Sequence, residues 1–352
     1  MIMDLPNRYE FQGQTLSGGM GDVHICRDSN LDRSVAIKII QDEIYADRIL
    51  DEVRAFKRVS SKHVVEIYDI IQTDDEVAII EEYLPGDELR PPSDGLVKEQ
   101  FLRTAYQIAS GLCEIHASGL IHRDIKPFNM KFDDEGVLKI FDFGLARQFG
   151  VDSSTRGFRG TPGFAAPELY QDETFDFTPA IDVYAFGVTC LYFALGYLPD
   201  EIIHPRVRQT TLTPFRDLAV DLLPNDLLQL LDRTLEFFPS SRPSIFEVHE
   251  LIERHLLFNK HRALLILNGE SHFLGEDRPN VTVTAGNKGK IAIRYDGLYF
   301  KVRRFEGVIM INNSYVEEGM IMPGACVMSF GPPDTKGRVH VTFDISHPGV
   351  VL

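Results

Sequence analysis

Residues 120–147 decide the fold and read LIHRDIKPFNMKFDDEGVLKIFDFGLAR. Two short polar loops flank a predicted β-hairpin in this stretch. The first loop offers a carboxylate at Asp124, a cation at Lys126 and an amide at Asn129, and the second loop offers a carboxylate at Asp142. Phosphoryl transfer depends mostly on positioning and on neutralising phosphate charge, and these groups supply both. The stretch therefore predicts phosphoryl-transfer chemistry.

The same stretch resembles the eukaryotic-type protein kinase family, because it combines an HRD motif at 122–124 with a DFG motif at 142–144. Either tripeptide is common by chance, but the two together with Lys126 and Asn129 are specific. The resemblance implies that Asp124 accepts the proton of the substrate hydroxyl and that Lys126 contacts the transferring phosphate. It also implies that Asn129 and Asp142 bind Mg²⁺, with Mn²⁺ as the alternative metal.

The resemblance covers residues 8–258 and implies an α+β, bilobal protein-kinase fold. A β-rich N-lobe is expected over 8–82, a hinge over 82–86 and a helical C-lobe over 87–258. The helical spacing of apolar residues predicts a helix within 97–119 that ends at Gly119. The apolar positions of this helix are Phe101, Leu102, Ala105, Ile108, Ala109, Leu112 and Ile115.

Charge and cysteine content limit the partners that we expect. The 352-residue chain has a net charge of −16, and residues 1–259 alone carry 25 Lys+Arg against 43 Asp+Glu. Such an acidic body repels nucleic acid and anionic membrane, so neither is expected as a partner. The four cysteines are scattered without a CxxC pair, the first residues do not show the charged-then-apolar pattern of a signal peptide, and no run of about 18 apolar residues occurs. A cytoplasmic protein is expected.

A glycine-rich turn between two predicted strands resembles the loop that covers nucleotide phosphates in the family. Leu16 occupies the place of the family's first glycine. Lys38, in the predicted strand VAIK, would reach the α- and β-phosphates, and the backbone of Glu82 and Leu84 would bind adenine. The expected ATP-binding residues are Leu16, Gly18, Gly19, Met20, Gly21, Val23, Ala36, Lys38, Glu81, Glu82, Leu84 and Lys131.

A partner carboxylate must hold Lys38. We expect Glu52, because the apolar positions that follow it would seat a helix against the sheet. Glu43 is the alternative partner. If Glu43 does not pair with Lys38, it is expected to be a solvated surface charge.

Two residues of the expected adenine pocket depart from the family pattern. Glu81 stands at the back of the pocket, and Lys131 stands where the family offers an apolar side chain beneath adenine. A lone charge in a half-buried pocket is costly, so we advance the hypothesis that these two residues form an ion pair. The alternative is that each side chain turns outward to solvent.

Residues 145–168 resemble an activation loop. Thr155 is the preferred phosphorylation site and Ser153 and Ser154 are the others, with Arg123 and Arg147 as receivers of the phosphate. The alternative is an unmodified polar loop. The resemblance also implies supporting roles for Thr161, which would bond Asp124 and Lys126, for Asp182, and for an ion pair between Glu168 and Arg242. Small-molecule kinases of related fold lack this region, so a protein substrate is expected.

Beyond residue 262 the sequence changes to short alternating β-runs separated by Gly, Asn and Pro. A small all-β sandwich is expected over 263–352. The stretch 307–331 faintly resembles the end of a forkhead-associated domain, a phosphothreonine reader, although its phosphate ligands have no clear counterpart upstream. The partner of this domain would be a protein, a phosphopeptide or the kinase domain itself.

These observations predict a serine/threonine protein kinase that uses ATP and Mg²⁺, phosphorylates proteins and autophosphorylates its activation loop. The alternative is a catalytically weak kinase-fold scaffold that acts through its C-terminal β domain. The catalytic residues Asp124, Lys126, Lys38 and Glu52 favour the enzyme, whereas Glu81, Lys131 and the missing first glycine favour the scaffold.

Overall fold

The computed structural model describes residues 5–18, 21–40, 53–54, 56–72, 76–142, 147–148, 161–170, 177–203, 214–218, 223–267 and 269–346. The chain forms two compact units, residues 1–252 and 253–352. The limit between them falls inside helix α7 (Ile245–Leu257), slightly before the end at residue 258 that the sequence predicts for the kinase fold.

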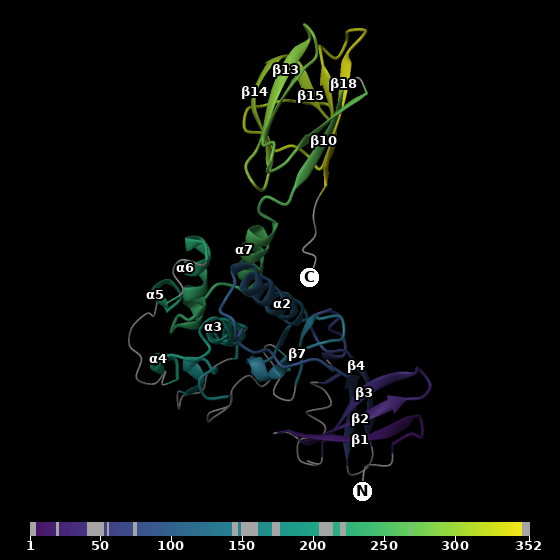
Figure 1. Ribbon diagram of the computed structural model, residues 1–352, viewed down its shortest axis with the longest axis vertical. Helices are drawn as coiled ribbons and strands as arrows, with labels where there is room; N and C mark the ends of the chain where they lie inside the picture. The colour runs from purple at the N-terminus through teal and green to yellow at the C-terminus, as the bar shows by residue number, and fades with distance from the viewer. Residues whose placement is uncertain are drawn as a thin grey trace. The chain divides into compact units, whose positions relative to one another are not determined.

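The first unit begins with a five-stranded antiparallel sheet in the order β1-β2-β3-β5-β4 (Figure 1). Val35 and Ile37 of β3 are fully buried with Ile80 of β5, as suits β-branched side chains in a sheet. Ala36 pairs with Glu81 across β3 and β5, so the side chains of these two residues lie on one face of the sheet. The strands are β1 (Tyr9–Gly18), β2 (Gly21–Asp28), β3 (Arg33–Ile40), β4 (Ile67–Gln72) and β5 (Val77–Glu82).

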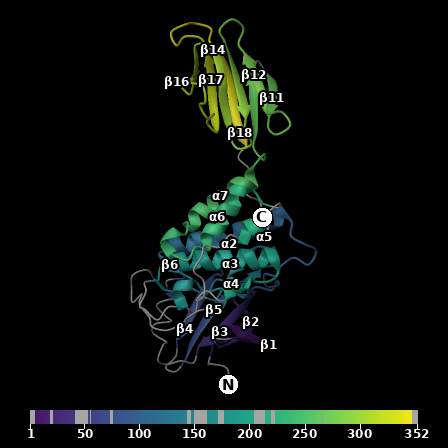
Figure 2. The ribbon, with the colours of Figure 1, turned by 90° about the vertical axis from the view of Figure 1, so that its left-hand side faces the viewer.

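The rest of the first unit is mainly helical, with α2, α3 and α6 lying beside one another (Figure 2). All seven apolar positions predicted for the helix within 97–119 are buried, which confirms that prediction. No helix among the described residues is long and apolar enough to cross a membrane. Besides α7, the helices are α2 (Lys98–Ala117), α3 (Ala180–Leu195), α4 (Asp200–Ile203), α5 (Pro214–Leu218) and α6 (Asn225–Thr234).

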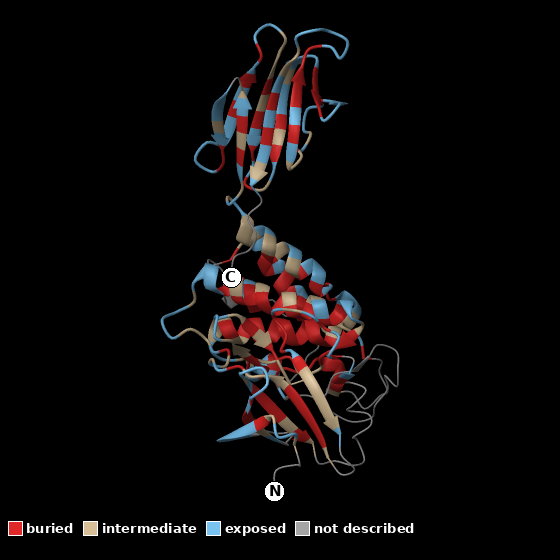
Figure 3. Cartoon of the chain, turned by 90° about the vertical axis from the view of Figure 1, so that its right-hand side faces the viewer, coloured by how far each residue is buried: buried red, intermediate tan, exposed pale blue. Residues whose placement is uncertain are grey.

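Helix α3 is the most buried helix of this part, and Figure 3 shows buried residues concentrated in the helical layer. Its Gly187 lets α6 approach closely, because a Cβ atom at this position would lie 2.0 Å from Thr234 Oγ1. Asp182 in the first turn of α3 is fully buried. The tight packing therefore fixes a carboxylate in the interior, next to the segment that leads into Asp124.

Two small antiparallel strand pairs carry the motif segments. Strands β7 (Met130–Phe132) and β8 (Leu138–Ile140) pair antiparallel, which confirms the predicted hairpin between the polar loops. Strands β6 (Leu120–Ile121) and β9 (Arg147–Gln148) pair in the same way. The short 3₁₀ helices are η1 (Pro127–Asn129), η2 (Pro167–Tyr170) and η4 (Pro239–Ser241).

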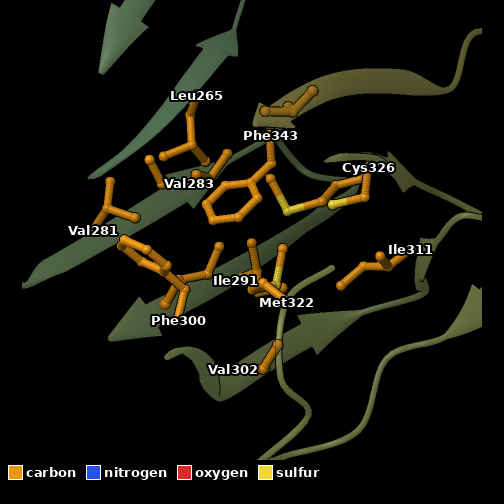
Figure 4. Packing of buried hydrophobic residues seen from close by; sticks show 14 of the residues in the cluster. Leu265, Val281, Val283, Ile291, Phe300, Val302, Ile311, Met322, Cys326 and Phe343 are labelled. Carbon is orange, nitrogen blue, oxygen red and sulfur yellow. The ribbon is translucent and has the colours of Figure 1, made fainter. Parts of the chain in front are cut away.

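The second unit consists of two antiparallel sheets with the strand orders β11-β10-β18-β17-β15-β16 and β12-β13-β14. Residues of both sheets share one core; Figure 4 shows Phe343 and Cys326 of the first sheet with Ile291 and Phe300 of the second. The strands are β10 (Arg262–Leu267), β11 (Glu270–Leu274), β12 (Asn280–Thr284), β13 (Gly289–Tyr295), β14 (Phe300–Gly307), β15 (Ile309–Ile311), β16 (Ser314–Tyr315), β17 (Ala325–Phe330) and β18 (Val339–Ser346).

Candidate active site

The loop that carries Asp124 is anchored by hydrogen bonds to the side chain of Asp182. The two oxygens of the Asp182 carboxylate accept hydrogen bonds from the backbone N–H groups of His122 and Arg123, both at 2.8 Å. His116 Nε2 lies 2.9 Å from Asp182 Oδ2. Burial opposes ionisation of Asp182, but the bond from His116 and the other donors prevail and lower its pKa. A buried, ionised Asp182 thus fixes the backbone just before Asp124.

The backbone at Arg123 is in an uncommon conformation. Its φ is 74°, in the left-handed region that non-glycine residues rarely occupy. Such a conformation persists only where the surroundings hold it, and here Asp182 and the ring of Phe177 do so. The Arg123 guanidinium carbon lies 3.5 Å from the Phe177 ring centroid.

The Asp124 carboxylate is surrounded by hydrogen-bond donors. Lys126 Nζ lies 2.6 Å from its Oδ2, and Thr161 Oγ1 donates to its Oδ1 at 2.8 Å. Asn129 Nδ2 donates to the same Oδ2 at 2.9 Å and to the Asp124 carbonyl at 2.8 Å. Lys126 Nζ also donates to Thr161 Oγ1 at 2.7 Å. The donors hold the carboxylate in one orientation, in which it can accept a further proton donor such as a hydroxyl.

Lys38 reaches across the cleft to Asp142. Its Nζ lies 2.5 Å from Asp142 Oδ1. Burial opposes ionisation of Asp142, but the attraction of Lys38 outweighs it and lowers the pKa of Asp142. Asp142 has a φ of 67°, so a second motif residue occupies the left-handed region. The expected partners Glu52 and Glu43 of Lys38 lie outside the described residues.

Most of the residues predicted for nucleotide binding and catalysis line one cavity of about 610 Å³. The structure brings together residues from the β1–β5 sheet, the hinge and the loops around η1 and β7. Gly19 and Met20 lie outside the described residues, and Gly18 and Gly21 face each other where β1 and β2 pair. The predicted residues in the lining are Leu16, Val23, Ala36, Lys38, Glu81, Glu82, Leu84, Asp124, Lys126, Asn129, Lys131 and Asp142.

Sequence reasoning missed several residues of the cavity wall. Glu88 and Phe128 are side chains that no motif singles out, although Phe128 stands inside the most informative stretch of the chain. Ile25 lies two residues after Val23 on β2, so alternation predicts it on the same face, whereas Val65, Tyr83 and Phe141 lie outside the strands and no periodic pattern marks them. The missed residues are Ile25, Val65, Tyr83, Glu88, Phe128 and Phe141.

In the hinge, the backbone N–H of Glu82 is hydrogen-bonded within the protein, whereas the backbone of Leu84 is not. Glu82 bonds through its backbone N–H to the Glu66 carbonyl at 2.9 Å, and its side chain pairs with Lys139 Nζ at 2.7 Å. Among the backbone hydrogen bonds of the described residues, none uses the N–H or the carbonyl of Leu84. The backbone of Leu84 is therefore available to a ligand in the cavity.

The hypothesis of an ion pair between Glu81 and Lys131 is wrong. Among the ion pairs of the described residues, none joins these two side chains, although both line the cavity. Lys131 lies on β7, where its backbone forms a bridge with Glu88. The charges that act on the Glu81 carboxyl are instead those of Lys38 and Asp142. Burial raises the pKa of the Glu81 carboxyl to about 7, Lys38 opposes this shift and Asp142 adds to it.

The raised pKa of Glu81 predicts a pH-dependent loss of stability. The folded protein binds this proton more tightly than the unfolded chain, so the contribution is complete below pH 4.5 and is lost as pH rises through about 7. Relative to Glu81→Gln, we expect the free energy of unfolding of the natural protein to fall by about 2–3 kcal/mol across this range.

The measurement is urea unfolding followed by the helical circular dichroism signal, which comes almost entirely from the first unit. Groups that do not interact with Glu81 titrate equally in both proteins, so their contribution cancels in the difference. If the difference in free energy of unfolding between the natural protein and Glu81→Gln stays constant with pH, the prediction is contradicted.

Glu168 and Arg242 form the ion pair that the sequence predicts. Arg242 Nη1 and Nη2 bond the two oxygens of Glu168, both at 2.7 Å. This bidentate pair anchors the end of the segment that carries Thr161. The expected phosphorylation sites Ser153, Ser154 and Thr155 lie outside the described residues.

Comparison with known proteins agrees with this geometry. The family model of the protein kinase domain matches residues 9–254. The chain is 31% identical over 251 residues to "Maternal embryonic leucine zipper kinase" of Xenopus tropicalis, covering 69% of this chain and 38% of that protein. It is 30% identical over 255 residues to "CBL-interacting serine/threonine-protein kinase 12" of Arabidopsis thaliana, covering 69% of this chain and 52% of that protein.

A bacterial protein is similar as well. The chain is 36% identical over 206 residues to "Serine/threonine-protein kinases drp72" of Corynebacterium efficiens, covering 54% of this chain and 39% of that protein. The matched region thus spans between 38 and 52% of the length of these three relatives. The family model covers more than half of the chain, from the first strand of the sheet into α7. The chain therefore belongs to the protein kinase domain family.

Proposed function

We propose that this chain is a serine/threonine protein kinase that transfers the γ-phosphate of ATP to hydroxyl groups of proteins. The observation that carries the proposal is the closed set of hydrogen bonds among Asp124, Lys126 and Thr161. It leaves a fixed carboxylate at the mouth of a cavity large enough for a nucleotide. The relatives named serine/threonine kinases add support.

In this proposal the sheet β1–β5 and the helical part act as the two lobes, and ATP binds between them. Leu84 offers backbone groups to adenine, and Leu16, Val23 and Ala36 cover its ring. Lys38 holds the phosphates through its cation. Asp124 orients the acceptor hydroxyl and accepts its proton, while Lys126 neutralises charge on the transferring phosphate.

The donor chemistry of Asn129 and Asp142 fits a magnesium ion. Asn129 uses Nδ2 for both bonds to Asp124, and its Oδ1 accepts no hydrogen bond from a described residue. Asp142 gives Oδ1 to Lys38, and its Oδ2 accepts no hydrogen bond from the described part of the chain. These two oxygens are the hard ligands that Mg²⁺ prefers. When bound, the metal neutralises phosphate charge, with Mn²⁺ as an alternative.

The test is autophosphorylation of the full chain with labelled ATP and Mg²⁺, with phosphorylated residues mapped by mass spectrometry. We expect incorporation that chelation with EDTA abolishes, on Thr155 or on its neighbours Ser153 and Ser154. Phosphate there would add charge for Arg123 and Arg147 to bind. No transfer to the chain or to any protein substrate, with either metal, would favour the scaffold alternative.

For the second unit we propose a protein-binding role, as a forkhead-associated-like domain with altered phosphate ligands. Its own hydrophobic core supports a separate module. The test measures binding of two peptides to the full chain by fluorescence anisotropy: a phosphothreonine peptide and the same peptide without the phosphate. Binding of the phosphorylated peptide alone would support phosphothreonine recognition. Binding of neither peptide would exclude phosphothreonine recognition and leave docking of another protein surface.

The cytoplasm remains the proposed location. All four cysteines, Cys26, Cys113, Cys190 and Cys326, are free thiols, and burial raises the pKa of each. Free, unreactive thiols suit a reducing compartment.

A further inference from the structure

Phe128 is an exposed aromatic residue beside the proposed acceptor site. The residue is 54% exposed, whereas Pro127 and Asn129 on either side are buried. Single exposed apolar residues are common on protein surfaces and usually need no explanation. Phe128 differs because it lines the same cavity as Asp124 and Lys126. Its apolar surface therefore borders the cavity that contains the Asp124 carboxylate.

The turn that carries Phe128 is fixed to Asp124. Asn129 Nδ2 donates to the carbonyl and to the carboxylate of Asp124, at 2.8 and 2.9 Å. The Asn129 N–H donates to the Lys126 carbonyl at 3.0 Å. These bonds hold the backbone of η1 next to Asp124, so Phe128 is presented from a turn that is anchored to the catalytic loop. A subsite needs such a rigid support.

The charges around Phe128 do not favour a charged substrate residue. Lys126 is paired with Asp124 at 2.6 Å. Glu88 and Lys131 line the same cavity with opposite charges, and their backbones are bridged to each other. With one charge of each sign, this lining favours neither an acidic nor a basic substrate residue, and a charged side chain placed over the Phe128 ring would lose part of its hydration. An apolar side chain would instead remove apolar surface of both groups from water.

We propose that Phe128 forms an apolar subsite that selects protein substrates with a large aliphatic or aromatic residue close to the phosphorylated Ser or Thr. The inference rests on the proposed function, because the acceptor hydroxyl must lie at Asp124 for its neighbours to reach Phe128. Phe128 thereby determines specificity and takes no part in the chemical step.

The test uses the full chain and a set of peptides with one Ser in a constant Gly-Ala sequence. Each flanking position carries Leu, Phe, Lys or Glu in turn. We expect one flanking position at which Leu or Phe raises kcat/KM about tenfold over Lys or Glu. In Phe128→Glu this preference is expected to disappear and Lys to be preferred at the same position. Phe128→Leu is expected to keep the apolar preference.

The matched control is Phe246→Glu, since Phe246 is 50% exposed on α7 and is not part of the cavity lining. Its peptide preference is expected to equal that of the natural protein. A preference that Phe128→Glu leaves unchanged would overturn the subsite.

A second readout separates failure of the subsite from failure of the proposed function. Binding of the same peptides, with Ala in place of Ser, is measured by fluorescence anisotropy. Selective binding of the Leu peptides that Phe128→Glu abolishes, without any phosphate transfer, would overturn the kinase function and keep the subsite. Transfer to peptides without selection at any position would keep the kinase function and overturn the subsite. Neither transfer nor selective binding would overturn both.

Discussion

Replacing Asp124 with asparagine is expected to lower the rate of phosphate transfer by a factor of about 10²–10⁴, the usual contribution of general base catalysis. The natural carboxylate accepts hydrogen bonds from Lys126 at 2.6 Å and from Thr161 at 2.8 Å. Asparagine has the same size, but it lacks the negative charge, and its NH₂ group would face one of these donors. The variant therefore loses both the proton acceptor and the fixed orientation. Initial rates with labelled ATP and Mg²⁺ measure the effect.

The matched control for this prediction is Asp134→Asn. Asp134 is exposed in the turn between β7 and β8, and it makes no side-chain hydrogen bond or ion pair among the described residues. Its removal changes the net charge by the same amount, so the rate is expected to equal that of the natural protein. Asp124→Asn with a natural rate, in a preparation that unfolds at the natural temperature, would show that Asp124 is not the base.

The catalytic loop was predictable because its chemistry is local. Asp124, Lys126 and Asn129 stand within six residues, and the donor or acceptor capacity of each is fixed by its type. The structure joins them by direct hydrogen bonds. The long apolar stripe of α2 was predictable for a similar reason, since a helical period fixes which side chains share a face.

The contacts of Glu81 could not be predicted from the sequence. Its place at the end of β5 was readable, but the direction in which a long side chain turns inside a cavity depends on every wall of that cavity. The walls come from β3, β7 and the loop after β8, which are distant in sequence. Lys131 was assigned as a partner on charge alone, whereas the nearby charges that act on Glu81 are Lys38 and Asp142.

In the second unit, the strands that alternate carry the clearest sequence signal. The runs NVTVT and KIAIRY alternate strictly and form β12 and β13. The run RALLIL is nearly continuous in apolar residues, and β10 lies inside its sheet, between β11 and β18. Without alternation, a short apolar run such as that of β10 fits a piece of helix as well as a strand.

Removing the charge of Glu168 is expected to lower the free energy of unfolding of the first unit by about 3–5 kcal/mol, as for other buried pairs that lose one partner. The side chain of Arg242 has no exposed surface, and that of Glu168 is 10% exposed. In Glu168→Gln the guanidinium stays buried without a countercharge. Backbone carbonyls of Ala180, Glu236 and Phe237 still accept its hydrogen bonds, so the effect should lie near the lower end of the range.

Glu247→Gln provides the matched control, because Glu247 pairs with Arg233 at 2.8 Å while both side chains are 48% exposed. Water already screens this pair, and its loss is expected to cost about 0–1 kcal/mol. Urea unfolding followed by the helical circular dichroism signal measures both variants. If the two variants lose equal stability, the burial of Arg242 is not what makes its pair strong.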